Sequence, residues 1–214
     1  AEKDQRTAES SLLSRLCLVM SRGEIEISGG ALVLCALLFY LDQSGVAGPL
    51  LLSSLCHELG HWWAVKALGG RVAGFRLTWA GAQLRLSGAH PLSSGRMVLA
   101  ALAGPGTNLL LALGCILLAR HGAGGGLYLF AGINLGLAVF NLLPARWLDG
   151  GRVLESLLTC LGRERCADGL LHVCSWCVTG LFLVSGLFLL WESEGRNFTV
   201  FLAGVWMAQG NLGN

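Results

Sequence analysis

The stretch His57-Glu58-Leu59-Gly60-His61 decides how this chain folds. It lies inside an apolar run from Val46 to Leu68, which is long enough to cross a membrane as a helix. An ionisable side chain at bilayer depth is unfavourable by a few kcal/mol on insertion scales, so by default it marks function. Three such side chains within five residues predict a chemical site inside a membrane-spanning helix.

The composition agrees with a membrane protein. Of the 214 residues, 54% are hydrophobic and only 13% are charged, whereas a soluble domain carries about 25% charged residues. The net charge of +2 is small and no run of Lys and Arg is present. These features argue against nucleic acid as a partner and favour the lipid bilayer.

Apolar segments divide the chain into about six candidate transmembrane helices, each of which should contain roughly 20 mostly apolar residues. They lie near residues 28–41, 46–68, 95–119, 125–143, 170–191 and 198–210. The last is the weakest, since it is too short to cross alone. A polar segment, residues 1–22, is expected to precede a membrane domain over residues 23–214.

Two regions are expected not to be helical. Residues 23–27 alternate between polar and apolar side chains, as in a half-buried strand. Residues 71–87 contain two alternating runs around Ala80-Gly81-Ala82 and predict a β-hairpin at the cytoplasmic interface, with an irregular loop as the alternative. The predicted fold class is therefore an α-helical polytopic membrane protein with a small interfacial β-hairpin or sheet.

Basic residues predict the orientation of the spans, because cytoplasmic loops carry an excess of Lys and Arg. They gather between the second and third spans and between the fourth and fifth. They are Lys66, Arg71, Arg76, Arg85 and Arg96 in the first loop, and Arg146, Arg152, Arg163 and Arg165 in the second. The N-terminus and both basic loops are thus expected to be cytoplasmic, with the active site nearer that side.

The histidine motif has the spacing of a metal site. Residues four apart lie on the same face of a helix, so His57 and His61 can direct two imidazoles at one ion. Glu58 lies on the adjoining face, where it can act as a general base, as in zinc proteases. The alternative, histidines that are merely hydrogen-bonded within a helix bundle, leaves the buried Glu58 unexplained.

Asp149 is the best candidate for a third ligand. It lies in the segment from Asn141 to Arg152, where Pro144 should end the fourth helix and Gly150-Gly151 allow a close turn. Irregular backbone at membrane depth is tolerated only where it is buried in protein or lines a watery cavity. The alternative is that Asp149 caps a helix that starts near Arg152.

Other potential metal ligands fit less well. The remaining histidines, His90, His121 and His172, lie in loops or at the end of a span. Cys174 and Cys177 have the spacing of a redox or metal pair, but no second pair completes a zinc site. The cysteines are expected to be small buried hydrophobic residues.

Three motifs together resemble the site-2 protease family of intramembrane zinc metalloproteases. They are His57 to His61, Ala103-Gly104-Pro105-Gly106-Thr107-Asn108, and Asn141 to Gly151, in that order. Within the family, the run from Phe140 to Arg152 looks especially like stage IV sporulation protein FB, which cleaves the precursor of a sporulation sigma factor.

The resemblance implies that His57, His61 and Asp149 bind one zinc ion and that Glu58 is the catalytic base. It places Asn141 near the scissile bond, although a structural polar contact between helices is an alternative role. It also implies a membrane-bound protein substrate, received as an added strand by the interfacial sheet. Whether a regulatory membrane partner gates the enzyme is left open by the sequence.

Two residues near Asp149 depart from the family pattern. Trp147 stands where many members have a second proline, and Arg146 is unusual so close to a metal site. Gly104, Pro105 and Asn108 are expected to provide close helix packing or a kink near the cavity.

Other functions remain open. A general protease of membrane signalling or clearance would carry the same residues, as would a catalytically idle relative that binds substrate. A zinc or proton-coupled transporter also places ionisable groups in spans. Such a transporter more often shows repeated halves, and no internal repeat is evident in this chain.

Overall fold

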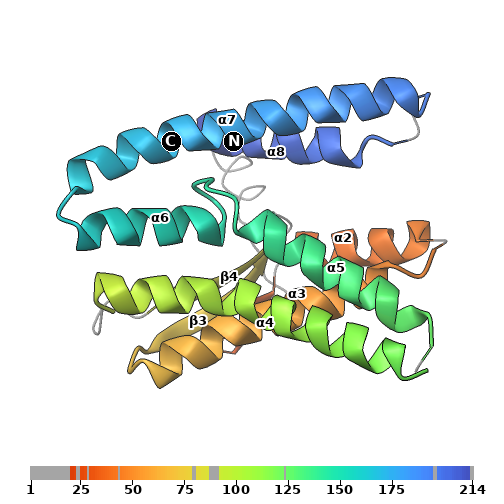
Figure 1. Cartoon of the computed structure of the whole chain (residues 1–214), viewed down its shortest axis with the longest axis horizontal. Coiled ribbons are helices and arrows are strands. Elements are labelled where there is room, and N and C mark those ends of the chain that lie inside the picture. Colours follow the sequence, from red (N-terminus) through yellow and green to blue (C-terminus); the bar gives the residue numbers. More distant parts are fainter. Residues whose placement is uncertain are drawn as a thin grey trace, which may run out of the picture.

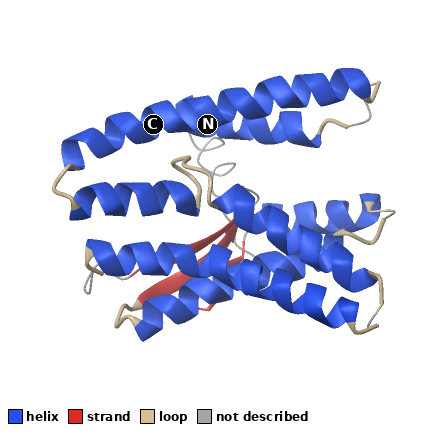
Figure 2. Ribbon diagram, in the orientation of Figure 1, coloured by secondary structure: helices blue, strands red, loops and turns tan. Residues whose placement is uncertain are grey.

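The computed structural model describes residues 20–22, 25–27, 29–42, 44–78, 81–86, 92–122, 124–194 and 197–212. The predictions made for residues 1–19 and for His90 lie outside these ranges. Helices dominate the described chain, and a small sheet accompanies them (Figure 2).

Six helices occupy the segments predicted as apolar spans. They are α2 (Gly29–Leu41), α3 (Ala47–Ala67), α4 (Ser94–Arg120), α5 (Gly126–Asn141), α7 (Glu164–Glu192) and α8 (Thr199–Leu212). A seventh, α6 (Asp149–Cys160), follows the loop that contains Pro144. Because α6 combines a polar and an apolar face, it does not read as a span in the sequence.

Within the part of the chain that the structure describes, two stretches could cross a membrane by length and composition, Ser94–Arg120 and Cys166–Glu192. The apolar helices α2, α5 and α8 have 13, 16 and 14 residues, fewer than the roughly 20 that a perpendicular span requires. Helix α3 has 21 residues but contains the polar motif. The count of six spans therefore stays a prediction.

The strands form one four-stranded sheet in the order β1-β2-β3-β4. Its members are β1 (Met20–Arg22), β2 (Ile25–Ile27), β3 (Val72–Thr78) and β4 (Gly81–Leu86). Strands β3 and β4 pair antiparallel in the segment where the sequence predicted a hairpin, and β2 joins β3 in parallel. Strand β1, from the predicted N-terminal segment, pairs with β2.

The helices form two groups that meet at α6 (Figure 1). In the first group α4 packs against both α3 and α5, and the sheet contacts α3. In the second group α7 and α8 lie side by side. Helix α6 contacts both α4 and α7, and a small apolar core of Ala145, Leu148, Val178 and Met207 joins the loop before α6 to the second group.

Helices α3 and α4 approach closely because small residues face each other. A Cβ atom added to Gly60 would lie 2.8 Å from the Ala103 carbonyl oxygen and would overlap the Thr107 side chain. Real Cβ contacts are not this short, so no larger residue fits at Gly60 without moving a helix. The close approach brings the α3 histidines directly against the α4 backbone.

The start of α3 is held by Asp42. Its carboxylate accepts a hydrogen bond from the Ala47 backbone N–H (2.7 Å) and two from Ser44. These bonds favour the charged form and lower the pKa of Asp42 to about 2, with the Ala47 bond making the largest contribution. The first turn of the motif helix is thereby fixed to the preceding loop.

Candidate metal centre

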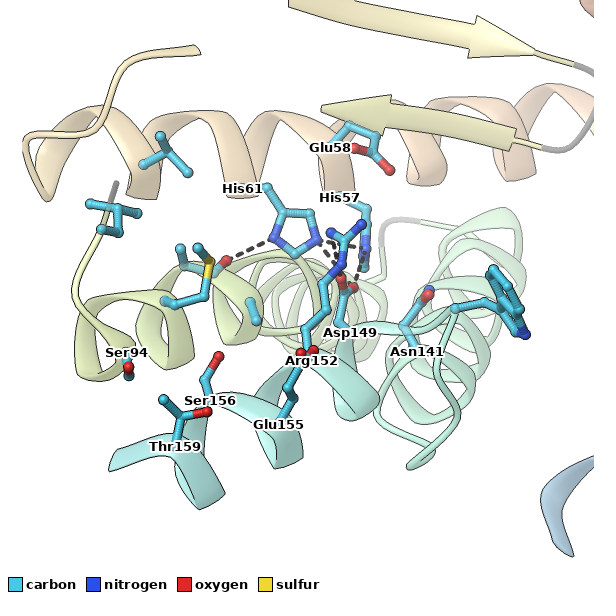
Figure 3. Close-up of a pocket in the computed structure, with 16 residues that line it drawn as sticks. His57, Glu58, His61, Ser94, Asn141, Asp149, Arg152, Glu155, Ser156 and Thr159 are labelled. Carbon is cyan, nitrogen blue, oxygen red and sulfur yellow. Dashed lines mark hydrogen bonds and ion pairs between the residues drawn. The ribbon is translucent and has the colours of Figure 1, made fainter. Parts of the chain in front are cut away.

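Three candidate ligand atoms from two distant parts of the chain, α3 and the start of α6, converge on one point (Figure 3). The Nε2 atoms of His57 and His61 lie 2.9 and 3.1 Å from Asp149 Oδ2, and 3.1 Å from each other. All three residues are buried, with 6–7% of their surface exposed. The structure therefore brings together the three residues that the sequence selected as candidate ligands.

The outer nitrogens of both imidazoles face hydrogen-bond acceptors. His57 Nδ1 lies 3.2 Å from Asn108 Oδ1, and His61 Nδ1 lies 2.8 Å from the Ala100 carbonyl oxygen. Each Nδ1 must therefore carry the proton, which leaves each Nε2 of a neutral imidazole with a lone pair. Two nitrogen lone pairs and a carboxylate oxygen then meet at about 3 Å, an arrangement that a bound metal cation would stabilise.

This arrangement fits a zinc ion. Two ligands at about 2.0–2.1 Å from a tetrahedral zinc lie roughly 3.3 Å apart, close to the separations of 2.9–3.1 Å found between the three donor atoms. Two histidines and one carboxylate are a common donor set of catalytic zinc sites. Hydrogen bonds that fix the unused ring nitrogen are also typical of metal-bound histidine.

Asp149 does not cap α6. The N-cap residue is Leu148, no side-chain cap bond is present, and the Asp149 carboxylate instead faces the two imidazoles. The other oxygen, Oδ1, lies 3.8 Å from Arg152 Nη1. Because Asp149 is in the first turn of α6, the helix dipole also favours its negative charge.

The loop before Asp149 is tightly folded, which explains its glycines. A Cβ atom on Gly150 would lie 2.5 Å from the Leu143 carbonyl oxygen, and one on Gly151 would overlap the Ala145 carbonyl. Within the loop, the Leu148 N–H donates to the Ala145 carbonyl oxygen (2.9 Å). The loop backbone therefore packs so closely against the start of α6 that positions 150 and 151, directly after Asp149, have no room for a side chain.

The two departures from the family pattern, Arg146 and Trp147, contact the α7–α8 pair. Arg146 Nη2 lies 3.4 Å from Asp168 Oδ1, and its backbone N–H donates to Ser175 Oγ (2.8 Å). The Trp147 indole N–H donates to Asn211 Oδ1 (3.2 Å). Both residues thus anchor the loop to helices α7 and α8.

Glu58 and Asn141 line the same cavity as the ligands (Figure 3). The cavity has a volume of about 490 Å³, and Trp147, Arg152, Glu155 and Ser156 also line it. Asn141 Nδ2 donates to the Leu137 carbonyl of its own helix (3.0 Å), so the described bond does not join two helices. Both side chains are placed where a bound substrate could reach them.

The other candidate ligands that the structure describes are not at the site. Of the described residues, those that group at metal-binding distance are His57, His61 and Asp149. Cys174 and Cys177 are free thiols on α7, and the latter is exposed rather than buried. His172 faces Trp176, with ring centroids 6.3 Å apart.

Sequence reasoning missed the outer contacts of the two histidines. The sequence predicts a packing role for Asn108. The contact at Ala100 is made by the main-chain carbonyl, so the residue type gives no sign of it. The spacing could have revealed both, because Ala100, Gly104 and Asn108 recur every four residues and so share one face of α4.

Replacing Asp149 by asparagine is expected to weaken zinc binding by more than the roughly 10–100-fold that loss of an outer contact produces. The amide keeps the shape but removes the anionic donor. Metal analysis and chelator competition on the purified protein measure the effect. Asp168→Asn, which alters an acidic residue paired with Arg146, is the control, and equal affinity in the two variants would contradict the ligand role.

The sequence comparisons point to metallopeptidases. The profile of Peptidase family M50 matches residues 117–183, which include Asp149 but not the histidine motif. Proteins named "Putative zinc metalloprotease Rip3", from two strains of Mycobacterium tuberculosis, are 35% identical over 133 residues, covering 58% of this chain. The match covers 33% of those relatives, so the chain spans about a third of their length.

The fold comparison extends over almost the whole chain. The structure of the site-2 protease from Methanocaldococcus jannaschii matches with a TM-score of 0.67 and 20% sequence identity. The match covers 91% of this chain and 92% of that one, and it concerns the fold. The chain is therefore similar in part of its sequence to M50 peptidases and to relatives named as zinc metalloproteases, and similar in fold to a site-2 protease.

Proposed function

We propose that this chain is an intramembrane zinc metalloprotease that hydrolyses a peptide bond in or near a transmembrane segment of a membrane-bound pro-protein. The observation that carries the proposal is the convergence of His57 Nε2, His61 Nε2 and Asp149 Oδ2 in a cavity that Glu58 also lines. Such a centre combines a metal site with a nearby carboxylate, which are the two parts that metal-assisted peptide hydrolysis requires.

Each residue has a distinct role in this proposal. His57, His61 and Asp149 hold zinc, which when bound supplies a Lewis acid that polarises a carbonyl and acidifies water. Glu58 accepts the proton of the attacking water and returns it to the leaving amine. Asn141 orients the substrate backbone or stabilises the developing oxyanion from the cavity wall.

The bilayer surrounds the site in this proposal. Large apolar residues remain exposed along α7, which is expected of a surface that faces lipid rather than water. They are Leu170, Val173, Trp176, Leu181, Val184, Leu187, Phe188 and Trp191. The positive-inside rule orients the N-terminus and both basic loops toward the cytoplasm, with the site nearer that side.

The substrate must be unwound before cleavage, because an intact helix keeps its carbonyls in internal hydrogen bonds. An extended segment could then add to an edge of the four-stranded sheet by backbone hydrogen bonding. A regulatory membrane partner that controls this access is part of the proposal.

The resemblance of residues 140–152 to stage IV sporulation protein FB makes a sporulation sigma-factor precursor one candidate substrate. The alternative is a membrane-signalling or clearance substrate. Expressing an inactive variant in the native host and identifying the membrane protein that accumulates uncut separates the two.

The test of the proposed activity is cleavage in reconstituted membranes. The purified chain and a tagged single-span substrate are placed in liposomes, and the products are followed by gel and mass spectrometry. We expect cleavage that stops when a chelator removes zinc and returns when zinc is added back. A zinc flux across the liposome membrane without any cleavage would instead support a transporter, whose paired histidines and carboxylate serve ion transfer.

A further inference from the structure

We propose that Asn108 is a positioning residue that holds the His57 imidazole, by accepting a hydrogen bond from Nδ1–H, in the one tautomer that can bind metal through Nε2. The inference rests on the proposed metal centre and adds a role for a residue of α4 that is not a ligand. Its basis is the geometry between α3 and α4.

The two histidines meet α4 in register. His61 Nδ1 faces the Ala100 carbonyl oxygen (2.8 Å), and His57 Nδ1 faces Asn108 Oδ1 (3.2 Å). Because the later residue on α3 meets the earlier one on α4, the helices run antiparallel. Gly104 lies between the two contacts, and a Cβ atom there would touch both imidazole rings.

The two contacts differ in what supplies the acceptor. The acceptor at Ala100 is a main-chain carbonyl oxygen, which is present whichever side chain occupies that position. His57 lies one turn before His61 on α3, and no main-chain oxygen of α4 makes a described contact with its ring. A side chain has to supply that acceptor, and the amide oxygen of Asn108 does so.

The burial of Asn108 argues against a role in packing alone. Its side chain is fully buried, and Nδ2 has no hydrogen-bond partner among the described residues. A buried amide with an unpaired N–H is unfavourable, so an apolar residue of similar size would pack better. The contact with His57 is the feature that an apolar residue could not provide.

The orientation of the amide decides which ring nitrogen is free. With Oδ1 toward the ring, as in this structure, Nδ1 carries the proton and Nε2 faces Asp149 Oδ2 with its lone pair. If Nδ2 faced the ring instead, Nδ1 would become the acceptor and Nε2 would carry the proton. His57 could not then bind metal through Nε2.

A second buried asparagine provides a matched control. Asn134 on α5 is also fully buried and has one unpaired polar atom, Oδ1. Its Nδ2 donates to Ser53 Oγ (2.8 Å), one helical turn before His57, and it contacts neither imidazole in a described bond. Asn134→Leu therefore removes a comparable buried polar contact to the same helix, α3, without altering the hydrogen bond of a ligand.

The experiment compares the full chain with Asn108→Leu, Asn108→Asp and Asn134→Leu in detergent or nanodiscs. Zinc affinity is measured by competition with a chromogenic chelator, and the cobalt-substituted proteins report the coordination geometry by visible absorption. We expect Asn108→Leu to bind zinc about 10–100-fold more weakly. Asn108→Asp, which keeps an acceptor, should restore affinity, and Asn134→Leu should bind as the unaltered chain does.

Nitrogen NMR of histidine-labelled, zinc-loaded protein tests the tautomer without any substitution. We expect His57 to bind zinc through Nε2 and to show a slowly exchanging proton on Nδ1. Zinc bound through Nδ1, equal affinity in Asn108→Leu and Asn134→Leu, or an Asn108→Asp variant as weak as Asn108→Leu would each overturn the inference. Failure of the unaltered chain to bind zinc would instead refute the metal centre itself, so the two failures are distinguishable.

Discussion

Replacing Glu58 by glutamine is expected to reduce peptide cleavage by about 10²–10⁴-fold, the range that general acid–base catalysis contributes. Glutamine has nearly the same size and still fits the cavity, but its amide cannot accept and return a proton at neutral pH. Glu58 is not among the three residues that group at metal-binding distance. Zinc content should therefore stay unchanged while cleavage is lost.

Glu155 offers a control within the same cavity. It lines the cavity from α6, is more exposed than Glu58 and lies outside the ligand group. We expect Glu155→Gln to retain cleavage, so that loss in both variants would indicate a general electrostatic effect. Cleavage of a membrane substrate at the normal rate by Glu58→Gln, with full zinc occupancy, would remove Glu58 from the mechanism.

The helices could be predicted because apolar length is a local signal. Each segment expected to be a span is a helix whose bounds differ from the prediction by at most two residues, except that α7 begins six residues before the predicted start. What the sequence did not predict is α6, whose apolar residues lie on one face and so leave no continuous apolar run. Strand β1 also went unpredicted, since three residues are too short for an alternating pattern to be visible.

The candidate ligands could be predicted for a different reason. The spacing of His57 and His61 fixes their common helix face, and an isolated carboxylate beside Gly150-Gly151 has few structural roles. That these groups meet within hydrogen-bond distance depends on how α3, α4 and α6 pack, which no local pattern contains. The outer contacts are even less visible, because one of them, to Ala100, comes from the main chain.

Arg146 and Trp147 depart from the family pattern, and contacts with residues far along the chain explain both. In the sequence they put the geometry of the loop in doubt. In the fold they bind Asp168 and Asn211, which lie on helices α7 and α8. The loop that carries Asp149 is therefore anchored from the side opposite to α3, by residues far along the chain.

Replacing Gly104 by alanine is expected to abolish stoichiometric zinc binding, and with it cleavage. The added Cβ would lie 2.6 Å from His61 Cε1 and 2.8 Å from His57 Cε1, and closer still to His61 Nε2. The rings cannot turn aside freely, because Asn108 and the Ala100 carbonyl hold their outer nitrogens. Either α3 and α4 separate or both imidazoles leave the ligand position.

Gly106→Ala and Gly114→Ala on the same helix isolate this effect, since a Cβ atom at either position has nothing within 4 Å. Both should keep full zinc binding, and helix stability should increase by about 0.5–1 kcal/mol because alanine is the better helix former. Isothermal titration with zinc and thermal unfolding of the three variants give the comparison. A Gly104→Ala protein that binds zinc like the two controls would show that the imidazoles do not lie against this face of α4. The close packing of α3 on α4 would then no longer account for how the metal centre is assembled.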